Sequence, residues 1–380
     1  MKAKFSPLSK LAVKADQPLL FPVFNKQGTL LAEKGTTLTA EQVDKITNLE
    51  EIYTYDRAMM SALVKNTGSS DESDAAFKLP PPFKRLSALE KILQEVFDKP
   101  SDPINKSKVL TIINRLQTIC QKSPDASIAK IITDDNTNYA IKHVIHTAIL
   151  CELSGQYLKW EPEERRNIIG AALTMNLSLG YLQNKLLDQA QPLTLEQKQI
   201  IHDHPKDSVA ILKKMGVSNT AWLEIVEKHH ENPEGTGYPS GLGHKELPIG
   251  ASLVSLSDVY CAKVTGRNYK KPIFADVAVR DIYLEKDPAH EGTLIEVFVK
   301  LLGIYPPGCM VKLKSNEIGI VIKRGERVDT PVVQILNDAK NESLMFKVKR
   351  QTDKKNYAIT SIINTKSELN KINYDDIWSI

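Results

Sequence analysis

Helical spacing of apolar residues dominates the middle of the chain. Leu86, Leu89, Leu93 and Phe97 recur at intervals of three and four residues, which puts them on one face of a helix. The same spacing predicts further helices over 109–119, 141–158, 163–175, 195–214, 221–230, 249–264 and 275–284. Capping boxes, Ser87 with Glu90 and Thr194 with Gln197, predict the starts of two of them. The region from about residue 126 to 300 is therefore predicted to be an all-helical domain, with further helices before it from residue 86.

Beyond residue 305 the apolar period changes from helical to alternating. Val311 and Leu313, then Ile318, Ile320 and Ile322, alternate with other residues on either side of a turn. An alternating period on both sides of a turn predicts a β-hairpin. A further strand is predicted at 331–336, so the C-terminal part is expected to be rich in β-structure.

The first 63 residues carry a mixture of the two patterns. Strands are predicted at 19–24, 29–31 and 52–55, and Thr39 with Gln42 forms a capping box for a short helix. The polar and then proline-rich stretch that follows has the composition of a linker.

These patterns predict a multidomain α+β protein. A central all-α bundle is flanked by a small N-terminal mixed domain and a C-terminal β-rich segment. The predicted parts are an N-terminal regulatory-type domain at 1–63, a linker at 64–85, connecting helices at 86–125, a helical domain at 126–304 and the β-rich segment at 305–380. Whether the helix before Pro100 is a rigid connector or part of the core is left open.

Composition narrows the class of protein. The 50 Lys and Arg against 46 Asp and Glu give a net charge of +4, which is too weak to indicate DNA binding. The four cysteines are widely separated, so neither a disulfide framework nor a cysteine zinc site is predicted. The N-terminus lacks the apolar core of a signal peptide, and no apolar run is long enough to span a membrane. We therefore expect a cytoplasmic protein.

Candidate chemistry is concentrated at residues 229–242. Two adjacent imidazoles, His229 and His230, end an apolar helical pattern, and a loop with three glycines and two prolines follows. Imidazole is a common metal ligand, and glycine lets a backbone approach a phosphate closely. A polar helix end followed by an ordinary turn would explain the His-His pair alone.

The segment from about 139 to 285 resembles the HD-GYP family, a branch of the HD superfamily of metal-dependent phosphohydrolases. The family signature, His-His-Glu followed by an Asp-Gly and a Gly-Tyr-Pro loop, stands at 229–242 with Glu234 in place of the Asp. The segments 193–205, 247–260 and 267–270 resemble three further motifs of the family. The resemblance implies a helical bundle that holds two or three iron or manganese ions and hydrolyses cyclic di-GMP.

The resemblance also assigns roles to residues. The implied metal ligands are His143, His204, His229, His230 and Asp258. The implied ligand-binding residues are the basic Arg267 and Lys270 and the loop residues Gly237, Tyr238 and Pro239. The remaining histidines, which match no ligand position and are expected at the surface or in packing, are His146, His202, His244 and His290.

The sequence departs from the family in the residues that name it. Met175 stands for the family's histidine, Asn176 for its bridging aspartate and Leu179 for its lysine, while Tyr139 stands for the glutamate of three-metal members. A thioether is a soft ligand that suits Mn²⁺ and Fe²⁺ poorly, and a neutral amide cannot bridge two cations as a carboxylate does. One Fe, Mn or Zn ion held by the remaining histidines is the most that we expect, rather than a complete di- or tri-metal centre. In the metal-free alternative, the histidines are hydrogen-bonded to one another and to Glu231 or Asp258.

Three functions remain. The favoured one is a degenerate HD-GYP protein in bacterial cyclic di-GMP signalling, which binds that nucleotide, a related one or a protein partner with little or no hydrolysis. The second is an active cyclic di-GMP phosphodiesterase with a reduced metal centre. The third is an interaction scaffold whose Gly-Tyr-Pro loop contacts a protein partner without nucleotide. A homodimer is compatible with each of them.

Overall fold

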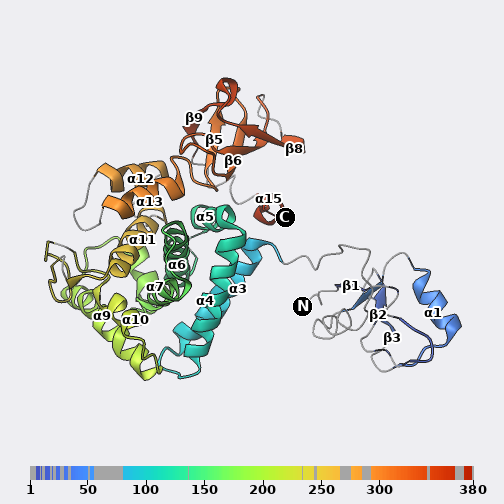
Figure 1. Ribbon diagram of the computed structural model, residues 1–380, viewed down its shortest axis with the longest axis horizontal. Coiled ribbons are helices and arrows are strands. Elements are labelled where there is room, and N and C mark those ends of the chain that lie inside the picture. Colours follow the sequence, from blue (N-terminus) through green and yellow to red (C-terminus); the bar gives the residue numbers. More distant parts are fainter. Residues whose placement is uncertain are drawn as a thin grey trace. The chain divides into compact units, whose positions relative to one another are not determined.

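The computed structural model describes two compact units, 1–78 and 79–380 (Figure 1). In the first unit it describes residues 6–8, 10, 13–17, 19, 23–25, 30–32, 36–49 and 52–54. In the second it describes residues 80–135, 137–232, 234–243, 246–265, 275–284, 292–339, 343–363 and 372–378. Most of the predicted linker therefore lies outside the described residues.

In its described residues, the N-terminal unit has a four-stranded sheet and one helix. Its strands are β1 (Ser6–Leu8), β2 (Val23–Asn25), β3 (Leu30–Ala32) and β4 (Ile52–Thr54), in the order β1-β4-β2-β3. The helix α1 (Ala40–Thr47) begins at the predicted capping box, in which the Thr39 side chain accepts from the Gln42 amide. The mixed character is confirmed, while β1 was not predicted from the sequence.

The second unit begins with the predicted run of helices. They are α3 (Pro82–Asp98), α4 (Asn105–Lys122), α5 (Pro124–Thr133), α6 (Tyr139–Tyr157), α7 (Pro162–Thr174), α8 (Leu182–Asp188), α9 (Leu195–Lys214), α10 (Thr220–Lys228), α11 (Ile249–Thr265), α12 (Ala275–Leu284) and α13 (Gly292–Leu302). The all-helical prediction is confirmed, as is the Thr194–Gln197 capping box of α9.

The predicted start of α3 at Ser87 is wrong. The helix begins five residues earlier, with Pro82 in its first turn, and Ser87 lies inside it. Proline suits a first turn because its fixed φ matches the helix and its missing N–H would have no partner there. The capping-box pattern was therefore coincidental.

One hydrophobic core joins α3 and α4 to the helices that follow. Leu89 and Leu93 of α3 are fully buried in the same cluster as Ile145 of α6 and Ile169 of α7. This answers the open question, since the helix before Pro100 is part of the core. Helix α6 lies at the centre and is buried along most of its length (Figure 1).

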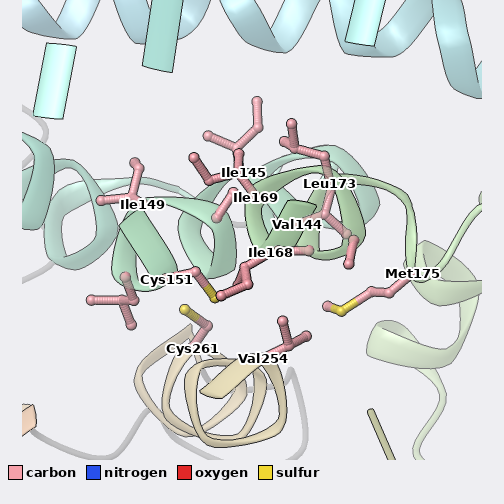
Figure 2. Packing of buried hydrophobic residues seen from close by; sticks show 14 of the residues in the cluster. Val144, Ile145, Ile149, Cys151, Ile168, Ile169, Leu173, Met175, Val254 and Cys261 are labelled. Carbon is pink, nitrogen blue, oxygen red and sulfur yellow. The ribbon is translucent and has the colours of Figure 1, made fainter. Parts of the chain in front are cut away.

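The four cysteines are all buried and unpaired. Figure 2 shows Cys151 of α6 and Cys261 of α11 facing each other inside the core. Burial raises the pKa of all four thiols, since the low-dielectric interior disfavours the thiolate. The absence of a disulfide framework is confirmed.

The C-terminal part is an antiparallel sheet of five strands, in the order β8-β7-β6-β5-β9. The strands are β5 (Met310–Leu313), β6 (Ile318–Lys323), β7 (Val332–Asn337), β8 (Ser343–Gln351) and β9 (Ile359–Ile362). The predicted hairpin is β5 with β6, and its register pairs Met310 with Ile320.

A short C-terminal helix, α15 (Tyr374–Ile377), connects the sheet to the bundle. The ring of Trp378 stacks on Phe83 of α3, and its indole N–H donates to the carbonyl oxygen of Ile322 in β6. Ala126 and Ala129 of α5 are buried in the same cluster. Among the described residues, no helix is both long and apolar enough to cross a membrane.

Candidate functional site

Three of the predicted ligands come together between α9 and the end of α10. His204 lies in the middle of α9, and His229 and His230 directly follow the last turn of α10. One nitrogen from each ring lies within 4.8 Å of the other two. His204 and His229 are buried, and His230 is partly exposed. The sequence predicted this grouping, and the two helices bring it about.

Backbone carbonyl groups fix which nitrogens of His204 and His229 carry protons. The Nδ1–H of His204 donates to the carbonyl oxygen of Ile201 at 2.5 Å, and that of His229 donates to Val226 at 2.7 Å. A carbonyl oxygen can only accept, so Nδ1 holds the proton in both rings. Both Nε2 atoms then present lone pairs, which is the tautomer that a metal ligand needs.

The two lone pairs face each other at a distance that suits a shared cation. Nε2 of His204 lies 3.3 Å from Nε2 of His229. Two nitrogen ligands of one tetrahedral ion, at bond lengths of about 2.1 Å each, have a very similar separation. Two opposed acceptors are unfavourable without a cation between them, so this arrangement fits one metal ion.

The other two predicted ligands, His143 and Asp258, are paired with each other. Nε2–H of His143 donates to Oδ1 of Asp258 at 2.5 Å. This hydrogen bond and the charges of the nearby histidines hold the pKa of the Asp258 carboxyl well below its usual range, against the effect of burial. The ring of Tyr139 stacks on His143, with centroids 4.8 Å apart. An aromatic ring thus covers the side on which the resemblance implied a glutamate ligand.

The glycine-rich loop folds back onto the histidines. The ring of Tyr238 stacks on His230 with centroids 4.6 Å apart, and the Tyr238 amide donates to the His230 carbonyl oxygen. A Cβ atom on Gly237 would lie 2.5 Å from backbone atoms of residues 230–232, so only glycine allows this approach. Pro239 follows, half-buried.

Glu231 holds the loop closed, a role that the sequence did not reveal. Its carboxylate accepts from the backbone amides of Ser240 at 2.6 Å and Leu242 at 2.9 Å. Of the two carboxylates that the metal-free alternative named, Asp258 bonds to a histidine, His143, whereas Glu231 bonds to the loop amides. The spacing of nine and eleven residues gave no signal for such a clamp.

The three departures from the family lie in buried positions after α7. Met175 is 0% exposed, and its sulfur points into the core toward Ile168 and Val254 (Figure 2). Asn176 and Leu179 are 3% and 7% exposed. The thioether and the isobutyl group are packed as apolar side chains, and neither supplies charge.

The structure describes two of the four histidines that match no ligand position, and neither of the two predicted phosphate ligands. His146 is a packing histidine, buried with Nε2 3.0 Å from Asp134, and His202 is half-exposed and stacks on Tyr238. The predicted phosphate ligands Arg267 and Lys270, together with His244 and His290, lie outside the described residues.

The metal-free protein is expected to lose stability as the pH falls below 6.5. Burial, followed by the charge of His229, lowers the pKa of His204 from 6.5 to about 3. The unfolded chain then binds the proton first, so stability is complete above 6.5 and falls continuously as the pH approaches 3. From pH 6.5 to pH 5 this one ring should cost about 2 kcal/mol of unfolding free energy. Urea titrations with a chelator present would measure it.

A matched pair of variants isolates the contribution of His204. His204→Asn should reduce the acid dependence by the contribution of one ring, because the buried His146, His229 and His230 also have lowered pKa values. His202→Asn, which removes a half-exposed imidazole two residues away, should keep it in full. Equal slopes in both variants would contradict the assignment to His204.

The model of the HD domain family matches residues 126–290. The chain is 24% identical over 240 residues to the cyclic di-GMP phosphodiesterase PA4108 of Pseudomonas aeruginosa, covering 63% of this chain and 58% of that protein. It is 24% identical over 238 residues to the cyclic di-GMP phosphodiesterase PdeB of Borreliella burgdorferi, covering 62% of this chain and 60% of that protein. The chain thus spans less than two thirds of either relative.

The fold also has a solved counterpart. An HDG"Y"P protein from Bdellovibrio bacteriovorus superposes with a TM-score of 0.51 at 16% identity, over 79% of this chain and 99% of that chain. These matches show an HD domain over residues 126–290 and bear out the resemblance to HD-GYP proteins.

Proposed function

We propose that this protein acts in bacterial cyclic di-GMP signalling by binding the nucleotide, or a protein partner, with little or no hydrolysis. The relatives from Pseudomonas aeruginosa and Borreliella burgdorferi are named cyclic di-GMP phosphodiesterases, which supports a cyclic dinucleotide as the ligand. The four buried, unpaired thiols fit a reducing cytoplasm.

One observation carries the proposal. The histidine cluster provides ligands for one ion, while apolar groups occupy the positions where the family has a histidine and a lysine. Met175 is packed in the core, and Leu179 is buried. Each lost electrostatic contact to a transition state commonly costs about 10²–10³ in rate. Losing a ligand, a bridge and a cation together should remove most of the turnover.

The cluster itself fits a metal ion. His204, His229 and His230 would hold it through neutral imidazoles, and three such ligands leave an open coordination position. Imidazole donors suit zinc and iron(II) better than manganese, which prefers carboxylates. A bound ion would supply a Lewis acid for a phosphate oxygen. Tyr238, stacked beside His230, would shape the space next to it.

An active phosphodiesterase with a reduced centre is the second candidate. The opposed Nε2 lone pairs of His204 and His229 support it, because they are arranged as two ligands of one ion would be. The third candidate, an interaction scaffold, is supported only by the Gly-Tyr-Pro loop. Glu231 holds this loop in a defined shape by accepting from two of its backbone amides.

Calorimetry with cyclic di-GMP and chromatography of its products, with zinc, iron(II) and manganese in turn, would test the proposal. We expect saturable binding without measurable product, and binding weakened at least about tenfold by Arg267→Ala, since losing one charged contact to a phosphate costs about this much. Arg280→Ala is the matched control, because Arg280 of α12 is exposed and contacts only Asp281, at 3.7 Å, among its described ion-pair partners.

The other outcomes separate the alternatives. Product formation that His229→Ala and His230→Ala abolish would reject the proposal in favour of a working enzyme. If the protein bound neither cyclic di-GMP nor metal, the interaction scaffold would be the remaining candidate function.

A further inference from the structure

A cleft lies on the bundle outside the histidine cluster. It has a volume of about 580 Å³ and lies between α4, the C-terminal half of α6 and the start of α7. Ligand pockets commonly fall between roughly 300 and 1,000 Å³, so its size suits a small molecule. Glu152 in its wall follows His143 by nine residues of α6, which is about 14 Å along the axis. The cleft is therefore separate from the His143–Asp258 pair, and none of the residues that line it belongs to the histidine cluster.

One face of α4 lines the cleft with uncharged polar side chains. Asn114, Gln117, Thr118 and Gln121 are spaced by three and four residues, so they lie on the same side of the helix. The opposite side of α4 carries Ile112, Leu116 and Ile119 into the core. A solvated helix face usually carries charged residues such as Lys and Glu. The lining face of α4 differs because it carries amides and a hydroxyl without charge.

A fully buried carboxylate lies behind these side chains. Glu152 is 0% exposed and accepts from Nε2 of Gln156 at 2.6 Å, Nε of Arg165 at 3.3 Å and Nε2 of Gln117 at 3.4 Å. Burial of such a group costs free energy, and an apolar residue of similar volume would commonly be as stable or more so. The stability of the fold therefore does not explain why a glutamate stands at this position.

The carboxylate orients the groups that line the cleft. Gln117 donates its amide N–H groups to Glu152 and to the carbonyl oxygen of Pro162, so its own oxygen is the atom left for a ligand. Gln156 likewise turns its nitrogen toward Glu152. Arg165 uses Nε for Glu152 and Nη1 for the carbonyl oxygen of Trp160, which leaves Nη2 as a donor. The cleft thus offers fixed acceptors and a fixed donor.

The charge of the lining selects against ions. Glu152 and Arg165 neutralise each other, and the other lining residues are uncharged. An anion or an ammonium group would lose its hydration without gaining an opposite net charge. A hydroxyl group both donates and accepts, so adjacent hydroxyls match neighbouring amide oxygens and N–H groups.

We propose that this cleft is a second binding site, and that its ligand is a small uncharged polyhydroxyl molecule, either a sugar or a linear polyol. The amide oxygens of Gln117 and Gln156 accept from its hydroxyls, and Arg165 and the amide groups of Asn114 and Gln121 on α4 donate to them. Glu152 is a positioning residue, since it acts through the side chains that it orients.

Isothermal titration calorimetry on the full chain tests this proposal. The probes are glucose, maltose and mannitol, with putrescine and glutarate as the charged probes. A thermal-shift assay would not suffice, because polyols stabilise most proteins by exclusion from their surface. We expect saturable binding of at least one neutral probe, with glucose and maltose against mannitol distinguishing a sugar from a linear polyol.

Three variants locate the binding. Gln156→Ala and Gln121→Ala should each weaken it at least about tenfold, which equals about 1.4 kcal/mol. Gln121 is exposed, so its substitution tests the site even if Gln156→Ala impairs folding. Gln199→Ala is the matched control, since that exposed glutamine of α9 bonds only to Asp203 among its described partners. Binding that these cleft variants leave unchanged, binding of a charged probe alone, or no saturable binding at all would each overturn the proposal.

Discussion

After loading with zinc, iron(II) and manganese together and extensive dialysis, the protein is expected to retain one ion per chain. His204, His229 and His230 provide three neutral nitrogen donors, and two of them already face each other at 3.3 Å. His143 and Asp258 are bonded to each other, and Met175 lies in the core, so ligands for a second ion are not assembled among the described residues. Zinc or iron should exceed manganese, in line with the imidazole donor set. Elemental analysis of the dialysed protein gives the number of ions per chain and the share of each metal.

Variants distinguish this site from adventitious binding. His229→Ala should lower the affinity by more than the roughly 10–100-fold that loss of an outer hydrogen-bond partner costs, because it removes a direct ligand. His202→Ala, which removes a half-exposed ring nearby, should retain the full ion content. Two ions per wild-type chain would contradict the single-ion site.

The triple variant Met175→His, Asn176→Asp and Leu179→Lys is expected to gain hydrolysis of cyclic di-GMP by at least about two orders of magnitude, the scale of one electrostatic contact to a transition state. The substitutions restore the residue types that the resemblance assigns to a ligand, a bridge and a phosphate-binding cation. The retained histidines would hold the first ion. The new histidine and aspartate would add ligands for a second. Chromatography of the products measures the rate, and the ion content should rise from one to two.

This variant carries a cost in stability that serves as an independent check. A histidine at position 175 replaces a side chain that is 0% exposed in an apolar cluster. Without metal, an unsatisfied buried polar group costs about 1–3 kcal/mol of unfolding free energy. Metal should restore that loss, whereas Met175→Leu should change neither rate nor ion content. A second ion without turnover would show that the ligands alone are insufficient, and would leave Tyr139 as the next position to change.

The sequence predicted the helical bundle well because its evidence is periodic. The spacing in α3 and α4 follows directly from burial of one helix face, and the Thr39 and Thr194 caps are local interactions between residues three apart. The same local logic misled at Ser87, where the pattern occurs inside a helix that a proline begins. Local patterns cannot tell a true cap from a chance match when the residues before it are also helical.

The sequence indicated which residues lie at the candidate site, but not which of them contact one another. The resemblance grouped five ligand positions, and the structure separates them into a three-histidine cluster and the His143–Asp258 pair. That division depends on which side chains meet across α6, α9, α10 and α11, which no spacing along the chain encodes. The Glu231 clamp and the Glu152 network were missed for the same reason, since each joins residues through the tertiary fold.

The buried cysteines make the protein unusually convenient for spectroscopic work. All four thiols are inside the core, and burial raises the pKa of each, so thiol reagents should leave them untouched in the folded state. One cysteine introduced at an exposed position of α4 or α9 would then be the single labelling site, with no native residue removed. A spin label or fluorophore on α4 could then report ligand entry at the cleft, and one on α9 could report entry at the histidine cluster. The hydrophobic core would be unchanged in both cases.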